Sequence, residues 1–146
     1  MTEREEKARD WLNRNYGFSM ELDAIQRRLD RMQADIEKCV KPIRLREVQE
    51  AQGVGNGTEE RMADWIDMSA ELEKKRLILL ARDRETLKII DMVDSPVLRT
   101  ILIERYVNRR PWKTMDQVLH YDRATIFRYH LQALSAIIPF IPGSVT

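Results

Sequence analysis

The chain has 146 residues, 34 % of them charged, and a formal net charge of +1. This length fits one domain, with or without an extension, and the high charged fraction is typical of long, solvated helices. One cysteine, Cys39, excludes an internal disulfide and a cysteine-based zinc site. No apolar run approaches the ~20 residues that cross a bilayer, and the N-terminus is too charged for a signal peptide. We therefore expect a soluble, cytoplasmic protein without a membrane partner.

The charge is distributed unevenly along the chain. Residues 1–94 carry 18 basic and 21 acidic side chains, a net charge of −3. Residues 95–146 carry 7 basic and 3 acidic side chains, a net charge of +4. A small basic module after a long, near-neutral and slightly acidic region suggests a polyanionic partner for the module.

The first part of the chain is predicted to be two helices. Thr2 and Glu5 form a capping-box pattern, Gly17 is placed to end the first helix, and Ser19 is placed to cap the second. The second helix has apolar residues at alternating steps of three and four, which is a heptad seam. Its members are Leu22, Ile25, Leu29, Met32, Ile36, Cys39 and Ile43. Pro42 lacks a backbone donor and should kink or stop this helix.

A glycine-containing segment, at about residues 47–58, breaks the periodicity and is expected to be a flexible linker. Thr58 then begins a further long helix that runs to about Val93, with Arg76 and Asp83 interrupting its apolar stripe. The stripe consists of Met62, Trp65, Ser69, Leu72, Leu79, Leu87, Ile90 and Val93. Two long helices with a loose linker favour an antiparallel hairpin, or a coiled coil between two chains.

Residues 95–146 are expected to form a separate module of three short helices. Ser95 and Pro96 are a helix start, followed by segments of about 97–107, 112–119 and 122–136 and an apolar, proline-broken tail. The side chains expected to point inward are Leu98, Ile101, Leu102, Tyr106, Met115, Val118, Leu119, Ile126, Tyr129 or His130, Ala133 and Leu134. The last two helices, separated by His120–Asp122, form a helix-turn-helix pattern with Asp122 as N-cap.

The helix after Asp122 has an outer face suited to DNA. With Ile126 in the core, the 100° step per residue turns four side chains outward and places Thr125 and Phe127 at the edges. The four are Ala124, Arg128, Leu131 and Gln132. Arg128 and Gln132 suit base edges in a major groove. Thr125 suits a base or a phosphate, and Phe127 or Ala124 suits a thymine methyl.

Four further cations are candidates for phosphate contacts. Arg109, Arg110 and Lys113 cluster at the start of the helix that precedes the turn, where backbone contacts usually form. Arg123 lies nearer the core side by angle, but its long side chain at the helix start could reach a phosphate.

The stretch from Leu98 to Leu134 resembles the C-terminal module of the ArpU/RinA-type phage late-transcription regulators and, more distantly, region four of bacterial sigma factors. The matching residues are Leu102, Arg105, Tyr106, Trp112, Met115, Tyr121, Ile126, Arg128, His130, Ala133 and Leu134. The resemblance covers about 40 residues. It departs from the family at Asp116, where a small residue is usual, and at His120, where the turn glycine is usual and a positive φ is expected.

The resemblance implies an all-α phage or prophage protein in a bacterial host cell that binds double-stranded promoter DNA and acts with RNA polymerase. It would be a transcription regulator and not an enzyme, since the sequence carries no phosphate loop, nucleophile–base pair or carboxylate cluster. We expect no cofactor. A homodimer is expected from the long helices.

The sequence also fits other interpretations. His120 and His130 could be metal ligands, although ten residues apart without a cysteine they form a weak pattern. The helix-turn-helix could belong to a small terminase-like packaging protein that builds a ring. The module could also contact a protein in place of DNA.

Overall fold

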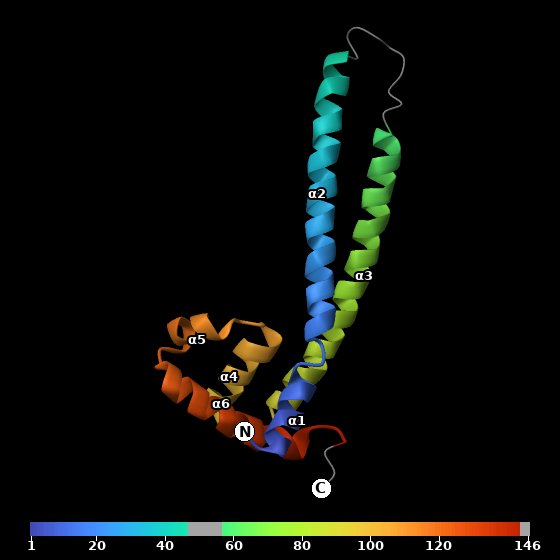
Figure 1. Ribbon diagram of the computed structural model, residues 1–146. Coiled ribbons are helices and arrows are strands. Elements are labelled where there is room, and N and C mark those ends of the chain that lie inside the picture. Colours follow the sequence, from blue (N-terminus) through green and yellow to red (C-terminus); the bar gives the residue numbers. More distant parts are fainter. Residues whose placement is uncertain (47–56, 144–146) are drawn as a thin grey trace. The chain divides into compact units, whose positions relative to one another are not determined.

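The computed structural model describes residues 1–46 and 57–143, with side chains for 1–40 and 57–143 (Figure 1). All regular elements of the described residues are helical and none is a strand, which confirms the expected all-α class. The helices are α1 (Glu3–Leu12), α2 (Tyr16–Arg46), α3 (Thr58–Ile90), α4 (Pro96–Leu102), α5 (Trp112–Leu119) and α6 (Arg123–Ile137), with a π-helical turn η1 (Ile103–Val107) and a 3₁₀ turn η2 (Ile138–Phe140). The expected linker at 47–58 lies outside the described residues except for Gly57 and Thr58.

Residues 18–78 form one compact unit, in which α2 and the first part of α3 run antiparallel, side by side (Figure 1). The seam residues Leu22 and Leu29 are buried. The Trp65 indole N–H donates to the backbone oxygen of Leu29 at 3.2 Å. The Arg76 guanidinium, which interrupts the apolar stripe, donates to the side-chain oxygen of Gln26 at 2.9 Å. The heptad seam therefore packs within one chain, as an intramolecular hairpin.

The expected capping box of Thr2 and Glu5 is confirmed at the start of α1, but the expected junction between the first two helices is wrong. Helix α1 ends at Leu12, where the Asn13 N–H donates to the carbonyl of Arg9, and α2 begins at Tyr16. Gly17 and Ser19 therefore lie inside α2 and neither ends nor caps a helix. Helix α2 also continues past Pro42 to Arg46. The side chain of Ile43, the last seam residue, lies outside the described part.

Residues 1–17 and 79–146 form the second compact unit. Its main core brings together buried side chains from α1, the end of α3, α4, η1 and α6: Ala8, Leu12, Ile90, Val93, Leu102, Tyr106, Ala133, Leu134 and Ile137. This differs from the expected division after residue 94, because the apolar faces of α1 and of the end of α3 are buried against the C-terminal helices. Ile138 and Ile141 of the tail pack on the same core, as expected.

The local signals in the C-terminal module predict its helices well. Ser95 caps α4 by accepting the Leu98 N–H at 3.4 Å, with Pro96 in the first turn. The first segment is interrupted, since the α-helix ends at Leu102 and a π-helical turn continues to Val107. Val118 is 37 % exposed, so its expected inward position is wrong.

Candidate nucleic-acid interface

Helices α5 and α6 are joined by the turn His120–Asp122, and each end of this turn is fixed by a specific contact. His120 has φ 60° and ψ 29°, which is the left-handed region, and its N–H donates to the carbonyl of Asp116 at 2.9 Å. Asp122 caps α6, because its Oδ1 accepts the Thr125 N–H at 2.7 Å. Hydrogen bonding with the side chain and with the backbone N–H of Thr125 holds the pKa of the Asp122 carboxyl below its usual value. The expected N-cap and the expected positive φ are both observed.

A small apolar cluster fixes the position of α6 against the helices before it. Ile101 of α4, Met115 of α5 and Ile126 of α6 are buried together, with Leu119 and Tyr129 packed against them. Complete burial of such a side chain contributes about 1.5–3 kcal/mol. The cluster holds the opposite face of α6 toward solvent.

The outer face of α6 presents the side chains expected to read DNA. Ala124, Phe127, Arg128 and Gln132 are exposed, and Thr125 is half-buried at the edge. Phe127 is 58 % exposed, which is unusual for a large aromatic ring without a partner. Leu131, also expected to point outward, is half-buried.

Ion pairs within the protein engage two of the four cations that were expected to contact DNA phosphates. Both terminal nitrogens of Arg109 bond the carboxylate of Asp83, at 2.8 and 3.2 Å, and both side chains are mostly buried. The Nε of Arg110 bonds the carboxylate of Glu104 at 2.8 Å. Arg109 is therefore engaged inside the protein, and Arg110 is partly neutralised.

Lys113 and Arg123 are exposed and make no ion pair with a described residue. Together with Met1, Trp112, Ile126, Phe127 and His130 they line a hollow of about 550 Å³. The hollow lies where the N-terminal ends of α5 and α6 come together. It combines two cations with two aromatic rings, which is a combination that binds nucleic-acid backbone and bases.

Sequence reasoning assigned no binding role to Trp112, which the structure places in this hollow at 38 % exposure. The Arg105 guanidinium lies 4.7 Å from its ring centre, and the His130 ring meets it edge-on at 4.5 Å between centroids. The sequence feature that could have indicated a binding role for Trp112 is its position beside Lys113 at the start of a short amphipathic helix.

His130 lies beneath the hollow as a buried, neutral side chain. Its Nε2 and the Tyr106 hydroxyl are 2.6 Å apart, and its Nδ1 is buried without a partner among the described residues. Burial lowers the pKa of His130 to about 4, assisted by the cations Arg105 and Arg9, and raises the pKa of Tyr106 to about 12. Among the side chains described for residues 1–40 and 57–143, no three of His, Cys, Asp or Glu gather as metal ligands.

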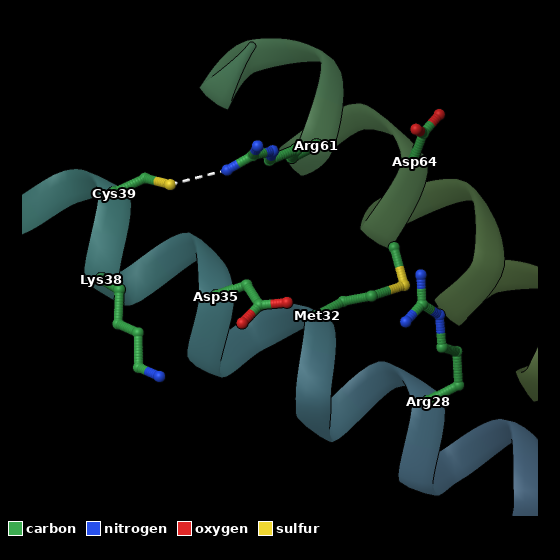
Figure 2. Close-up of a pocket in the computed structure, with 7 residues that line it drawn as sticks. All are labelled: Arg28, Met32, Asp35, Lys38, Cys39, Arg61 and Asp64. Atoms are coloured by element: carbon green, nitrogen blue, oxygen red, sulfur yellow. Dashed lines mark hydrogen bonds between the residues drawn. The ribbon is translucent and has the colours of Figure 1, made fainter. Parts of the chain in front are cut away.

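A second hollow, of about 420 Å³, lies between α2 and α3 in the hairpin unit. Figure 2 shows the Arg61 guanidinium directed at Cys39, with 2.7 Å between its nitrogen and the sulfur, while Asp35 and Asp64 also line the hollow. The mixed signs of charge make this hollow a poor site for a polyanion.

None of the described helices is both long enough and apolar enough to span a membrane. No family model, no curated protein and no solved structure matches the chain.

Proposed function

We propose that the protein is a phage or prophage transcription regulator that binds promoter DNA through α5 and α6 in the manner of region four of a sigma factor. The observation that carries the proposal is the exposed face of α6, held outward by the buried Ile126 and bordered by free cations. The mechanism is not catalytic. Helix α6 enters the major groove, and RNA polymerase or a second copy of the chain supplies additional affinity.

Base recognition is assigned to the exposed polar side chains of α6. Arg128 can form two hydrogen bonds with guanine, and Gln132 can do so with adenine, which is worth about 1–3 kcal/mol of discrimination for each pair. Phe127 and Ala124 offer apolar contact to a thymine methyl, and Thr125 can bond a base or a phosphate.

Contacts with the phosphate backbone of DNA are assigned chiefly to Lys113 and Arg123. Arg110, which is 35 % exposed in its ion pair with Glu104, is a secondary candidate. Arg109 has its guanidinium on Asp83 and serves the fold of the module. With this small number of cations, one copy should bind DNA modestly, and its affinity should fall steeply with added salt.

The proposal is tested first by identifying the DNA. Immunoprecipitation of the tagged protein, with sequencing of bound fragments and detection of polymerase subunits, should yield discrete promoter regions. Fluorescence anisotropy on such a fragment then compares wild type with Arg128→Ala/Gln132→Ala. We expect the preference for the specific fragment over random DNA to fall about 10–100-fold.

Arg27→Ala is the matched control, because it removes one exposed arginine from α2 in the hairpin unit and should leave the preference unchanged. If the wild-type protein shows no salt-sensitive DNA binding at low ionic strength, the proposal is wrong. The exposed Phe127 and the mainly apolar hollow beside it favour a second candidate in that event, namely a module that contacts another protein.

A further inference from the structure

Helix α3 carries a second apolar stripe that its own chain leaves exposed. Leu77, Leu80 and Leu87 are 59, 63 and 37 % exposed, and Ala70 is also exposed. Helix α3 is continuous from Thr58 to Ile90, so the 100° step per residue fixes where these residues lie around it. The stripe lies about a third of a turn away from the side on which Leu72 is buried.

The spacing of this stripe is that of a helix that pairs with another helix. Its positions follow steps of three and four without a break: Ala70, Glu73, Leu77, Leu80, Arg84 and Leu87. A strict repeat of this kind drifts slowly around a straight helix and favours a left-handed supercoil with a partner helix. Glu73 borders a hollow beside α2, and Arg84 and Leu87 border one beside α4 and η1. Ala70, Leu77 and Leu80 line neither hollow, so the centre of the stripe is left for another partner.

The two charged members of the stripe identify the partner. Glu73 and Arg84 are exposed, and neither forms an ion pair with a described residue. When two copies of α3 are aligned antiparallel with Leu77 opposite Leu80, Glu73 comes opposite Arg84. By the two-fold symmetry this pairing occurs twice. A parallel alignment would place Glu73 opposite Glu73 and Arg84 opposite Arg84, which is repulsive.

The remaining positions agree with the same alignment. Ala70 comes opposite Leu87, so a small residue faces a large one across the seam. At the flank, the exposed Asp67 of one helix comes near the exposed Lys88 of the other. Charges at flanking positions commonly set the partner and the orientation of paired helices.

We propose that two copies of the chain associate through the outer stripes of their α3 helices, antiparallel, with Leu77 and Leu80 at the centre and Glu73–Arg84 pairs on either side. The association does not depend on DNA. Its test is therefore made on the protein alone and is separate from the test of DNA binding.

The first experiment is sedimentation equilibrium of the full chain over a range of concentrations. Wild type should show a monomer–dimer equilibrium, and Leu77→Glu or Leu80→Glu should remain monomeric with unchanged helical circular dichroism. Met20→Glu, which replaces an apolar residue of α2 at 53 % exposure, is the matched control and should dimerise as wild type does. A wild-type protein that is monomeric throughout, or larger than a dimer, overturns the proposal.

The second experiment tests the alignment by charge exchange. Glu73→Arg and Arg84→Glu should each weaken the dimer about tenfold, since each replaces two attractive contacts by repulsive ones. The double variant E73R/R84E should regain wild-type association, because the pairs are restored in reverse. A double variant that associates as weakly as the single variants excludes the antiparallel alignment.

Discussion

His120 occupies the turn of the helix-turn-helix in a conformation that L-residues seldom adopt. Its φ of 60° lies in the left-handed region, which costs about 1–2 kcal/mol for a residue with a Cβ atom. His120→Gly removes this cost from the folded state. Glycine is also more flexible in the unfolded chain, which offsets about 0.4–1 kcal/mol of the gain in stability. We expect the free energy of unfolding in urea to rise by about 0.5–1 kcal/mol.

His120→Ala serves as the control for loss of the imidazole, since alanine keeps the Cβ atom and the strain. It should not stabilise the protein. A glycine variant that unfolds at a lower urea concentration than wild type would show that the His120 side chain contributes more than its backbone costs.

His130 makes the stability of the protein depend on pH. Its pKa is about 4 in the folded protein, against an ordinary value of about 6.5 in the unfolded chain. The unfolded chain therefore binds the proton more readily between these values. The contribution of neutral His130 is complete above about pH 6.5 and is lost as the pH falls toward about 4, by on the order of 3 kcal/mol in all.

The measurement is the free energy of unfolding in urea at several pH values between 5 and 7. His130→Gln offers the Tyr106 hydroxyl a polar partner but does not titrate, so its stability should change less over this interval. Equal slopes for the variant and the wild type would show that other groups cause the pH dependence.

At the scale of elements, the Arg109–Asp83 pair joins α3 to the segment between η1 and α5. The two side chains are 18 and 16 % exposed, so removing one partner leaves the other charge poorly solvated. Asp83→Ala should lower the free energy of unfolding by about 3 kcal/mol. The double variant Asp83→Ala/Arg109→Ala should lose less than the sum of the single variants, with a coupling of at least about 1 kcal/mol.

Denaturation in urea measures this coupling. The DNA affinity of the folded variants tests independently whether Arg109 contacts DNA. Arg109→Ala should leave the dependence of DNA affinity on salt unchanged, whereas Lys113→Ala should reduce its slope by about one. If Arg109→Ala reduced the slope and Lys113→Ala did not, Arg109 would be a phosphate contact and Lys113 would not.

Local chemistry predicts the helix starts in this chain better than the junction between α1 and α2. Ser95 and Asp122 were correct as caps because a cap bonds a backbone N–H three residues away. The prediction that Gly17 ends the first helix was wrong because the break between α1 and α2 occurs earlier, near Asn13. A glycine inside a helix costs only about 1 kcal/mol, so α2 can include it. The partner of Arg109 could not be foreseen, since Asp83 is 26 residues away in the sequence.

The candidate surface was predictable to a similar degree. The exposed face of α6 followed from placing Ile126 in the core, because the helical step determines the rest. The hollow did not follow, because it needs Met1 and Trp112 next to α6. The outer stripe of α3 was also missed, since the same helix carries the buried stripe and the two overlap in the sequence.

Pairing of two chains through α3 and DNA binding through α6 together predict the symmetry of the DNA site. An antiparallel α3 pair is related by a two-fold axis, and two-fold proteins bind inverted repeats. The wild-type protein should therefore protect both halves of an inverted repeat in a footprint. Leu77→Glu, which keeps the α6 face but removes the dimer, should bind each half-site independently.

The expected difference is large because linking two sites raises the effective concentration of the second. Loss of the dimer should weaken binding to the full repeat about 100-fold or more, while binding to an isolated half-site stays the same. Titration of both DNAs with both proteins distinguishes the causes of failure. Equal loss on the half-site would mean that Leu77→Glu damages the α6 face, and no loss on the full repeat would mean that the two copies bind DNA without the α3 contact.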